Sequence, residues 1–131
     1  MGMERRIFKR FPLALNGSLF LCQGRNGSRL TKPLSCRVVD LSRRGAGILT
    51  WQIIVDNSHL FFASLGSDQV ILHLAIDLEN TDEPPLTLAV RPLWFDRILL
   101  NEEQQPFQMG VKFFEKIAKE DFRRLKKVVA R

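Results

Sequence analysis

The chain contains 131 residues, of which 45% are hydrophobic and 26% are charged, and its formal net charge is +6. This composition excludes disorder over the whole length, and the length allows one domain around one core. Purely apolar runs such as residues 53–55 and 98–100 are too short to cross a bilayer, and residues 1–10 carry charges instead of an apolar signal segment. We therefore expect a cytoplasmic protein without a membrane span.

The cations concentrate at the two ends of the chain, in residues 1–10 and 116–131, and the body between them is slightly acidic. A surface that slides along duplex nucleic acid would be basic throughout. Nucleic acid is therefore not the expected partner, and we interpret the C-terminal run of charges as a solvated helix face.

Alternation of apolar and polar residues dominates the chain, and this period of two indicates β-strands. Four of the expected strands are named below by their apolar residues of one parity, and the other two by their residue ranges. In chain order they contain Leu13, Leu15, Leu19 and Leu21; residues 33–40; residues 46–54; Val70, Leu72, Leu74 and Ile76; Leu86, Leu88, Val90 and Trp94; and Phe107, Met109, Val111 and Phe113. About six strands are typical of a small barrel.

Polar segments rich in turn-forming residues separate these strands at residues 23–28, 79–85 and 101–106. A short helix over residues 59–65 would be capped by Asn57 or Ser58 and ended by Gly66.

The last segment changes its period. Its apolar residues share one face of a helix, and acidic residues stand in the first turn, where the helix dipole favours them. The apolar residues are Ala118, Phe122, Leu125 and Val129, and the acidic ones are Glu120 and Asp121. We predict a mainly β fold, a six-stranded antiparallel β-barrel with a C-terminal helix over residues 117–130 that covers an open end of the barrel.

Two short motifs carry the candidate binding chemistry. An Arg-x-x-x-Arg pattern, with a third arginine beside it, stands just before the first strand, and an Asp-x-Ser-x-x-Gly pattern stands between the second and third strands. The first motif supplies Arg5, Arg6 and Arg10, and the second supplies Asp40, Ser42 and Gly45. Each pattern is common alone, since Asp and Ser often hydrogen-bond their own backbone in tight turns.

In this order, ahead of a six-strand pattern and a final helix, the two motifs resemble those of the PilZ domain family. That family's pattern places Asp/Asn-x-Ser-x-x-Gly about thirty residues after Arg-x-x-x-Arg. The resemblance continues through residues 66–68 and 109–113 and so covers nearly the whole chain. It implies a split barrel with a C-terminal helix, and a site for the bacterial second messenger cyclic di-GMP.

The residue types suit that ligand. Arginine forks match phosphate oxygens and the O6/N7 edge of guanine, and their flat faces stack on bases. Asp40 accepts hydrogen bonds, which suits the N1–H and N2–H donors of guanine. Ser42 would donate to a phosphate or accept from a base, and Gly45 would supply a positive φ and a close backbone approach. The arginines and Asp40 would then grip opposite edges of one guanine.

We expect residues 1–12 to form a flexible arm that folds over a barrel domain of residues 13–131 when cyclic di-GMP binds. The new position of the arm would signal to a separate effector protein in motility, pilus, exopolysaccharide or virulence control. Ligand stoichiometry stays open, and Arg5 beside Arg6 suits a stacked pair of ligands. A homodimer would use the exposed face of the helix or residues 51–65.

Several alternatives stay open. Arg43 and Arg44 either contact phosphate or are exposed loop charges, and Trp94 either flanks a base or belongs to the core or rim. The domain could instead be a PilZ-like interaction module that binds no nucleotide, or an RNA-binding barrel, which needs aromatic and basic residues interleaved on exposed strands.

The sequence has no nucleophile–base pair and no phosphate-cradling loop, so we expect neither an enzyme nor a cofactor.

Cys22 and Cys36 fit no metal-ligand spacing, and we expect them to be small buried hydrophobes. His59 and His73 stand alone in the sequence, so no zinc site is predicted.

Overall fold

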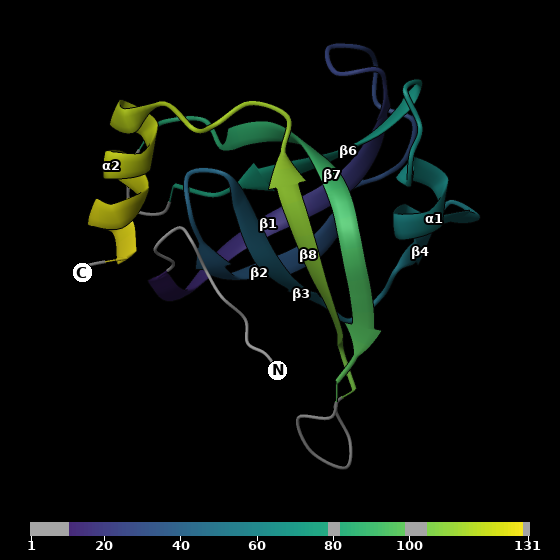
Figure 1. Ribbon diagram of the computed structural model, residues 1–131, viewed down its shortest axis with the longest axis horizontal. Coiled ribbons are helices and arrows are strands. Elements are labelled where there is room, and N and C mark those ends of the chain that lie inside the picture. Colours follow the sequence, from purple (N-terminus) through teal and green to yellow (C-terminus); the bar gives the residue numbers. More distant parts are fainter. Residues whose placement is uncertain (1–10, 79–81, 99–104, 130–131) are drawn as a thin grey trace.

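The computed structural model describes residues 11–78, 82–98 and 105–129 (Figure 1). Its elements in chain order are β1 (Phe11–Gln23), β2 (Leu34–Leu41), β3 (Gly45–Thr50), β4 (Ile54–Val55), β5 (Ser58–His59), α1 (Leu60–Ser64), β6 (Val70–Ile76), β7 (Leu86–Arg97), β8 (Phe107–Phe113) and α2 (Lys119–Val129).

Six of the strands close into a barrel in the order β1-β2-β3-β8-β7-β6, and every neighbouring pair is antiparallel. Closure removes the exposed sheet edges that would otherwise invite aggregation. The predicted six-stranded barrel is confirmed. The third strand ends at Thr50, earlier than residue 54, because Ile54 and Val55 pair with His59 and Ser58 in a separate small hairpin.

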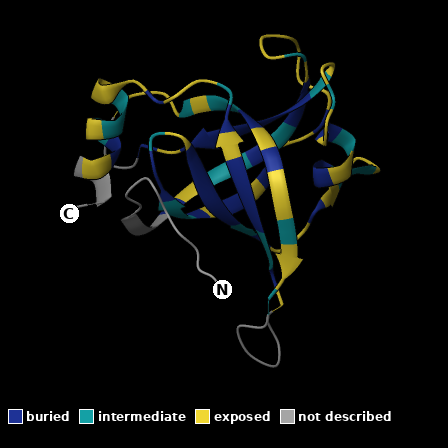
Figure 2. Ribbon diagram, in the orientation of Figure 1, coloured by how far each residue is buried: buried dark blue, intermediate teal, exposed yellow. Residues whose placement is uncertain are grey.

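Most of the predicted core residues of β1, β6 and β8 are confirmed, although Val70 and Phe107 are only half-buried and β6 is buried on both faces. The core-facing side chains of these strands are at most 4% exposed: Leu15, Leu19, Leu21, Leu72, Leu74, Ile76, Met109, Val111 and Phe113. They form the interior of the barrel, which Figure 2 shows in dark blue. Their removal from water is the main driving force for the fold.

The small hairpin β4–β5 turns through Asp56 and Asn57, whose φ angles of 52° and 66° lie in the left-handed region that a tight two-residue turn requires. The polypeptide then enters α1 directly. The structure corrects the predicted cap of this helix: the N-cap is His59, whose Nδ1 accepts a hydrogen bond from the Phe62 amide at 3.2 Å. Asn57 and Ser58 do not cap the helix, because the helix begins at Leu60 and the N-cap position directly before it is His59.

The His59 cap makes the stability of the protein depend on pH. Burial lowers the pKa of His59, so the folded state favours the neutral ring whose Nδ1 can accept the hydrogen bond. This contribution is present above the unfolded-state pKa of about 6.5 and is lost as the pH falls below it. We expect a loss of about 0.5 kcal/mol, the low end of the range for helix caps, between about pH 7.5 and pH 5.5. Chemical denaturation of His59→Asn, which caps without titrating, provides the reference. Identical pH profiles for the two proteins would contradict this role.

The C-terminal helix α2 begins at Lys119 and ends at Val129, within the range expected for it. Leu125 and Ile117, which lies just before the helix, are at most 2% exposed and join the core, so the helix covers part of the barrel. Arg124 pairs with Asp121 within the helix and with Glu83 before β7. No helix in the described ranges is long and apolar enough to cross a membrane.

Both cysteines are free and buried, as predicted. Burial, with the Asp77 carboxylate adding to it, raises the pKa of Cys36 to about 12, so this thiol stays protonated at neutral pH.

Candidate functional site

The Asp-x-Ser-x-x-Gly motif forms the turn between β2 and β3. The Ser42 amide donates to the Gly45 carbonyl at 2.9 Å, and the Ser42 hydroxyl accepts from the amides of Arg44 and Gly45 at 3.2 Å. Ser42 is only 2% exposed. Its hydroxyl therefore holds the shape of the turn, which is a common use of serine in tight turns.

Gly45 differs from the expectation in one respect. It is not among the glycines of the described chain with a positive φ, which are Gly24 and Gly66. Glycine is needed at position 45 for another reason: a Cβ there would overlap the backbone carbonyl oxygen of Val111 on β8. The residue thus permits the close approach of β3 and β8, and the positive φ predicted for it is wrong.

A β-bulge turns Asp40 toward the outside of the barrel. Val38 faces the core opposite Ile48 at 0% exposure, and strict alternation would turn residue 40 inward as well. The pairing shifts between Val38 and Asp40, so Asp40 pairs with Gly47 and the next residue, Leu41, faces the core. Bulges commonly re-aim a side chain next to a functional site.

A second bulge does the same for Trp94. Pro92 on β7 pairs with the core residue Val111, and the pairing then shifts so that Trp94 pairs with Gly110. The sequence placed Trp94 in the same parity as the core residue Val90. The structure corrects this, because the extra residue, Leu93, reverses the alternation and leaves Trp94 47% exposed on the outer face.

The two bulged side chains flank a pair of glycines. Asp40 pairs with Gly47, Gly47 with Gly110, and Gly110 with Trp94, so the four residues form one row across β2, β3, β8 and β7. A Cβ on Gly47 would lie 2.7 Å from Oδ2 of Asp40, and a Cβ on Gly110 would lie 2.5 Å from Cε2 of Trp94. The carboxylate and the indole therefore lean over the glycines from both ends. We call these four residues the glycine row.

Positive charge borders the glycine row. Lys112 on β8 and Arg91 on β7 pair with each other, and both are exposed. Lys112 lies two residues after Gly110 and so on the same face of β8. The outer face thus brings together an acceptor carboxylate, a half-exposed aromatic ring and two cations around a floor without side chains. Gly47 and Lys112 could not be predicted from the sequence, because only the strand register shows that they neighbour Asp40 and Trp94.

Arg43 forms hydrogen bonds with the backbone of Ile117, in the segment before α2. Its Nε donates to the Ile117 carbonyl at 2.9 Å, and its own carbonyl accepts from the Ile117 amide at 2.8 Å. The Arg44 carbonyl accepts from the Phe113 amide at 2.8 Å. These three hydrogen bonds tie the turn to the segment that leads from β8 into α2.

The predicted arginines Arg5, Arg6 and Arg10 lie outside the described residues. The described chain begins next to the site, however, because Phe11 pairs with Leu41 and Pro12 pairs with Asp40. The structure therefore brings the start of β1 beside Asp40, the acidic residue of the second motif.

Replacing Ser42 by alanine tests whether this hydroxyl acts mainly on the turn. The variant leaves the part-buried Arg44 amide and the buried Gly45 amide without their acceptor, so we expect the free energy of unfolding to fall by about 1–3 kcal/mol. The affinity for cyclic di-GMP, the expected ligand, should change little at temperatures at which the variant is folded. Urea denaturation measures the first effect and calorimetric titration the second. A stable variant that has lost ligand binding would instead assign Ser42 to the ligand.

Comparisons with known proteins place the fold. No protein-family model matches the sequence, and no curated protein matches it. Among solved structures, the PilZ domain with c-di-GMP of YcgR from Escherichia coli has a TM-score of 0.58 at 12% identity, over 97% of this chain and 90% of that one. The Bacillus subtilis inhibitor of motility, MotI/DgrA, has a TM-score of 0.52 at 15% identity, over 98% of this chain but only 51% of that one, so this chain spans about half its length. The chain therefore has the fold of a PilZ domain.

Proposed function

We propose that this protein is a receptor for cyclic di-GMP that binds the nucleotide on the glycine row and signals to a separate protein. One observation carries the proposal: two β-bulges turn Asp40 and Trp94 outward at opposite ends of a paired-glycine floor. The similar YcgR PilZ domain is described with c-di-GMP, which supports the choice of nucleotide.

The glycine row suits a guanine base. Asp40 accepts hydrogen bonds and so favours the N1–H and N2–H donors of guanine, whereas adenine offers no such pair of donors. The half-exposed indole of Trp94 supplies a stacking surface of the kind on which bases bind. Asp40 and Trp94 stand three strand spacings apart, about 14 Å along the sheet, and their inward lean shortens the gap that the ligand fills.

The phosphates need cations. Lys112 and Arg91 border the glycine row, and Arg10 immediately precedes Phe11, which pairs beside Asp40. In our proposal Arg5, Arg6 and Arg10 close over the bound ligand, where their forks contact phosphate and the Hoogsteen edge of guanine. Ordering that segment costs conformational entropy, which the new contacts must exceed.

The output passes to a partner through the turn and α2. The Arg43 and Arg44 carbonyls accept hydrogen bonds from Ile117 and Phe113, and the Arg43 side chain donates one to Ile117, so the turn is linked to the segment that leads into α2. Exposed apolar side chains in and before α1 are a separate candidate contact for a partner protein: Trp51, Ile54 and Phe62, each 45–60% exposed. The similar inhibitor of motility favours a role in motility control among the outputs.

A nucleotide panel tests the function. Calorimetric titration should detect saturable binding of cyclic di-GMP that Asp40→Asn weakens, and no Asp40-dependent binding of cyclic di-AMP, GTP or a single-stranded oligoribonucleotide. Binding of the oligoribonucleotide alone, with steep salt dependence, would favour the RNA-binding barrel. Absence of heat with every nucleotide would favour an interaction module without a ligand and would overturn the proposal.

A further inference from the structure

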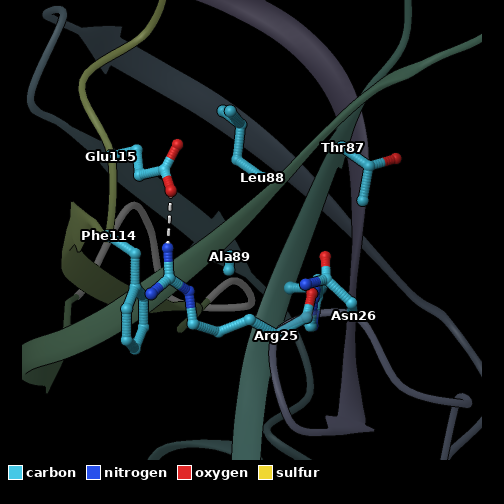
Figure 3. A pocket seen from close by; sticks show the side chains of 8 residues that line it. Arg25, Asn26, Thr87, Leu88, Ala89, Phe114 and Glu115 are labelled. Carbon is cyan, nitrogen blue, oxygen red and sulfur yellow. Dashed lines mark hydrogen bonds and ion pairs between the residues drawn. The ribbon is translucent and has the colours of Figure 1, made fainter.

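A second surface with binding chemistry lies on the outer face of the barrel, away from the glycine row. Here β6 and β7 meet the loop after β1 and the segment after β8 around a pocket of about 410 Å³ (Figure 3). Its lining includes Arg25, His73, Thr87, Phe114 and Glu115. The volume lies within the range of about 300–1,000 Å³ that is typical of small-molecule sites. A bare phosphate would leave most of it empty.

The loop that carries Arg25 is held in place. The Gly24 amide donates to the Gln69 carbonyl at 2.6 Å, and Gly24 has a φ of 75°, which a residue with a side chain rarely adopts. Nε2 of the buried His73 lies 3.0 Å from the Arg25 carbonyl. The backbone at Arg25 is therefore fixed on both sides, so a ligand would meet a preformed wall.

The Arg25 side chain is already oriented across the pocket. Its guanidinium lies 4.9 Å from the centre of the Phe114 ring and donates to Oε2 of Glu115 at 2.7 Å, as Figure 3 shows. A second guanidinium, that of Arg91, lies 4.4 Å from the centre of the same ring. The Phe114 ring thus contacts two guanidinium groups, of which that of Arg25 is paired with the exposed Glu115 carboxylate.

Aromatic and basic side chains continue beyond the pocket. The His73 ring stacks on Phe20 with the centroids 5.8 Å apart and the planes 7° from parallel. Arg29 lies over the Phe20 ring at 5.5 Å. Flat rings interleaved with guanidinium groups are the chemistry that binds planar anions.

We propose that this pocket binds a small organic anion with a planar ring, of the nucleoside monophosphate class. The phosphate binds Arg25, the ring packs against the aromatic wall at Phe114, and Asn26 and Thr87 face the sugar hydroxyls from the opposite wall. The proposal does not depend on cyclic di-GMP binding. The pocket shares no lining residue with the glycine row, and Phe114 stands four residues, or about 13 Å, along the chain from Gly110. Arg91, which borders the glycine row, lies over the Phe114 ring and so stands between the two sites.

Glu115 acts as a displaceable stand-in for the phosphate. The side chains of Arg25 and Glu115 are 47% and 80% exposed, and such solvated pairs are weak. A phosphate with more charge and three acceptor oxygens replaces the carboxylate on a guanidinium that Phe114 keeps in position. Removal of the competing carboxylate should therefore strengthen binding.

Titration of the full chain with 5′-GMP, followed by amide chemical shifts, tests the proposal. We expect saturable shifts at Ala89 and Phe114, affinity for 5′-GMP above that for inorganic phosphate, and a loss of about tenfold or more in Arg25→Gln. Phe114→Leu should also weaken binding, and Glu115→Gln, an exposed change that keeps the fold, should tighten it. The matched control is Arg97→Gln, which removes a guanidinium that lies 4.8 Å from the centre of a different ring, that of Phe107.

Three results would overturn the proposal: no shifts at Ala89 and Phe114 at millimolar 5′-GMP, equal affinity for 5′-GMP and inorganic phosphate, or weaker binding in Glu115→Gln. Asp40→Asn separates this site from the glycine row. It should leave the 5′-GMP shifts at Ala89 and Phe114 unchanged, and loss of those shifts in this variant would assign the signal to the glycine row instead. Failure of cyclic di-GMP to bind would leave all these expectations in place.

Discussion

Replacing Asp40 by asparagine should lower the affinity for cyclic di-GMP by about 30-fold or more. The change keeps the volume of the side chain over Gly47 but replaces an oxygen acceptor by an amide that donates, so guanine loses a charge-assisted contact. Breaking such a contact costs about 2–5 kcal/mol, which is the basis of the expected fold-change. Calorimetric titration measures it. Arg10→Ala should cause a loss of the same order if that arginine grips the other edge of the base.

Asp96→Asn is the matched control for Asp40→Asn. Asp96 is an exposed carboxylate on the same barrel, two residues beyond Trp94 on β7, and it pairs with Gln108 instead of a glycine. Its substitution should leave the affinity within about twofold of the wild type, as expected for a rim charge. Equal losses in the two variants would mean that Asp40 acts only through net charge, and wild-type affinity in Asp40→Asn would remove it from the site.

Replacing Gly45 by alanine should destabilise the whole barrel. The new Cβ would overlap the Val111 carbonyl oxygen and lie 3.4 Å from the Lys112 Cα, and both are backbone atoms that cannot rotate away. The strands β3 and β8 must separate, and we expect a loss of about 1–3 kcal/mol or more in the free energy of unfolding. Thermal and urea unfolding measure the loss. Ser35→Ala, at an exposed position of β2, should be nearly neutral. Unchanged stability in Gly45→Ala would show that the strands do not approach so closely.

The barrel was predictable from sequence because its core residues alternate in β1, β6 and β8. Leu72, Leu74 and Ile76 lie on one face of β6, and this spacing of two is a signal that a helix does not produce. Local capping was less predictable. His59 caps α1 with a ring nitrogen because the residues before it are used in a hairpin turn, and composition alone favours Asn57 or Ser58.

The candidate site was predictable only in part, since a bulge adds a residue without leaving a mark in the sequence. Asp40 could be named from its motif, but its outward direction comes from the register shift after Val38. The parity rule failed for Trp94, because Leu93 is the extra residue in β7. Gly110 lies in a segment of the family resemblance, yet its place beneath the indole depends on pairing between strands far apart in the chain.

The sequence also permits a direct optical test of the glycine row. The chain contains two tryptophans and no tyrosine, so Trp51→Phe leaves Trp94 as the dominant source of emission. In the reciprocal variant, Trp94→Phe, the remaining emission comes from Trp51, which is exposed and lies directly after β3, outside the glycine row.

Fluorescence titration of Trp51→Phe with cyclic di-GMP therefore tests the central claim most directly. We predict a saturable change in Trp94 emission whose midpoint matches the calorimetric affinity, no change with cyclic di-AMP, and no change in Trp94→Phe. Calorimetric binding of cyclic di-GMP with unaltered Trp94 emission would place the ligand elsewhere on the protein, and the absence of both signals would contradict the receptor function itself.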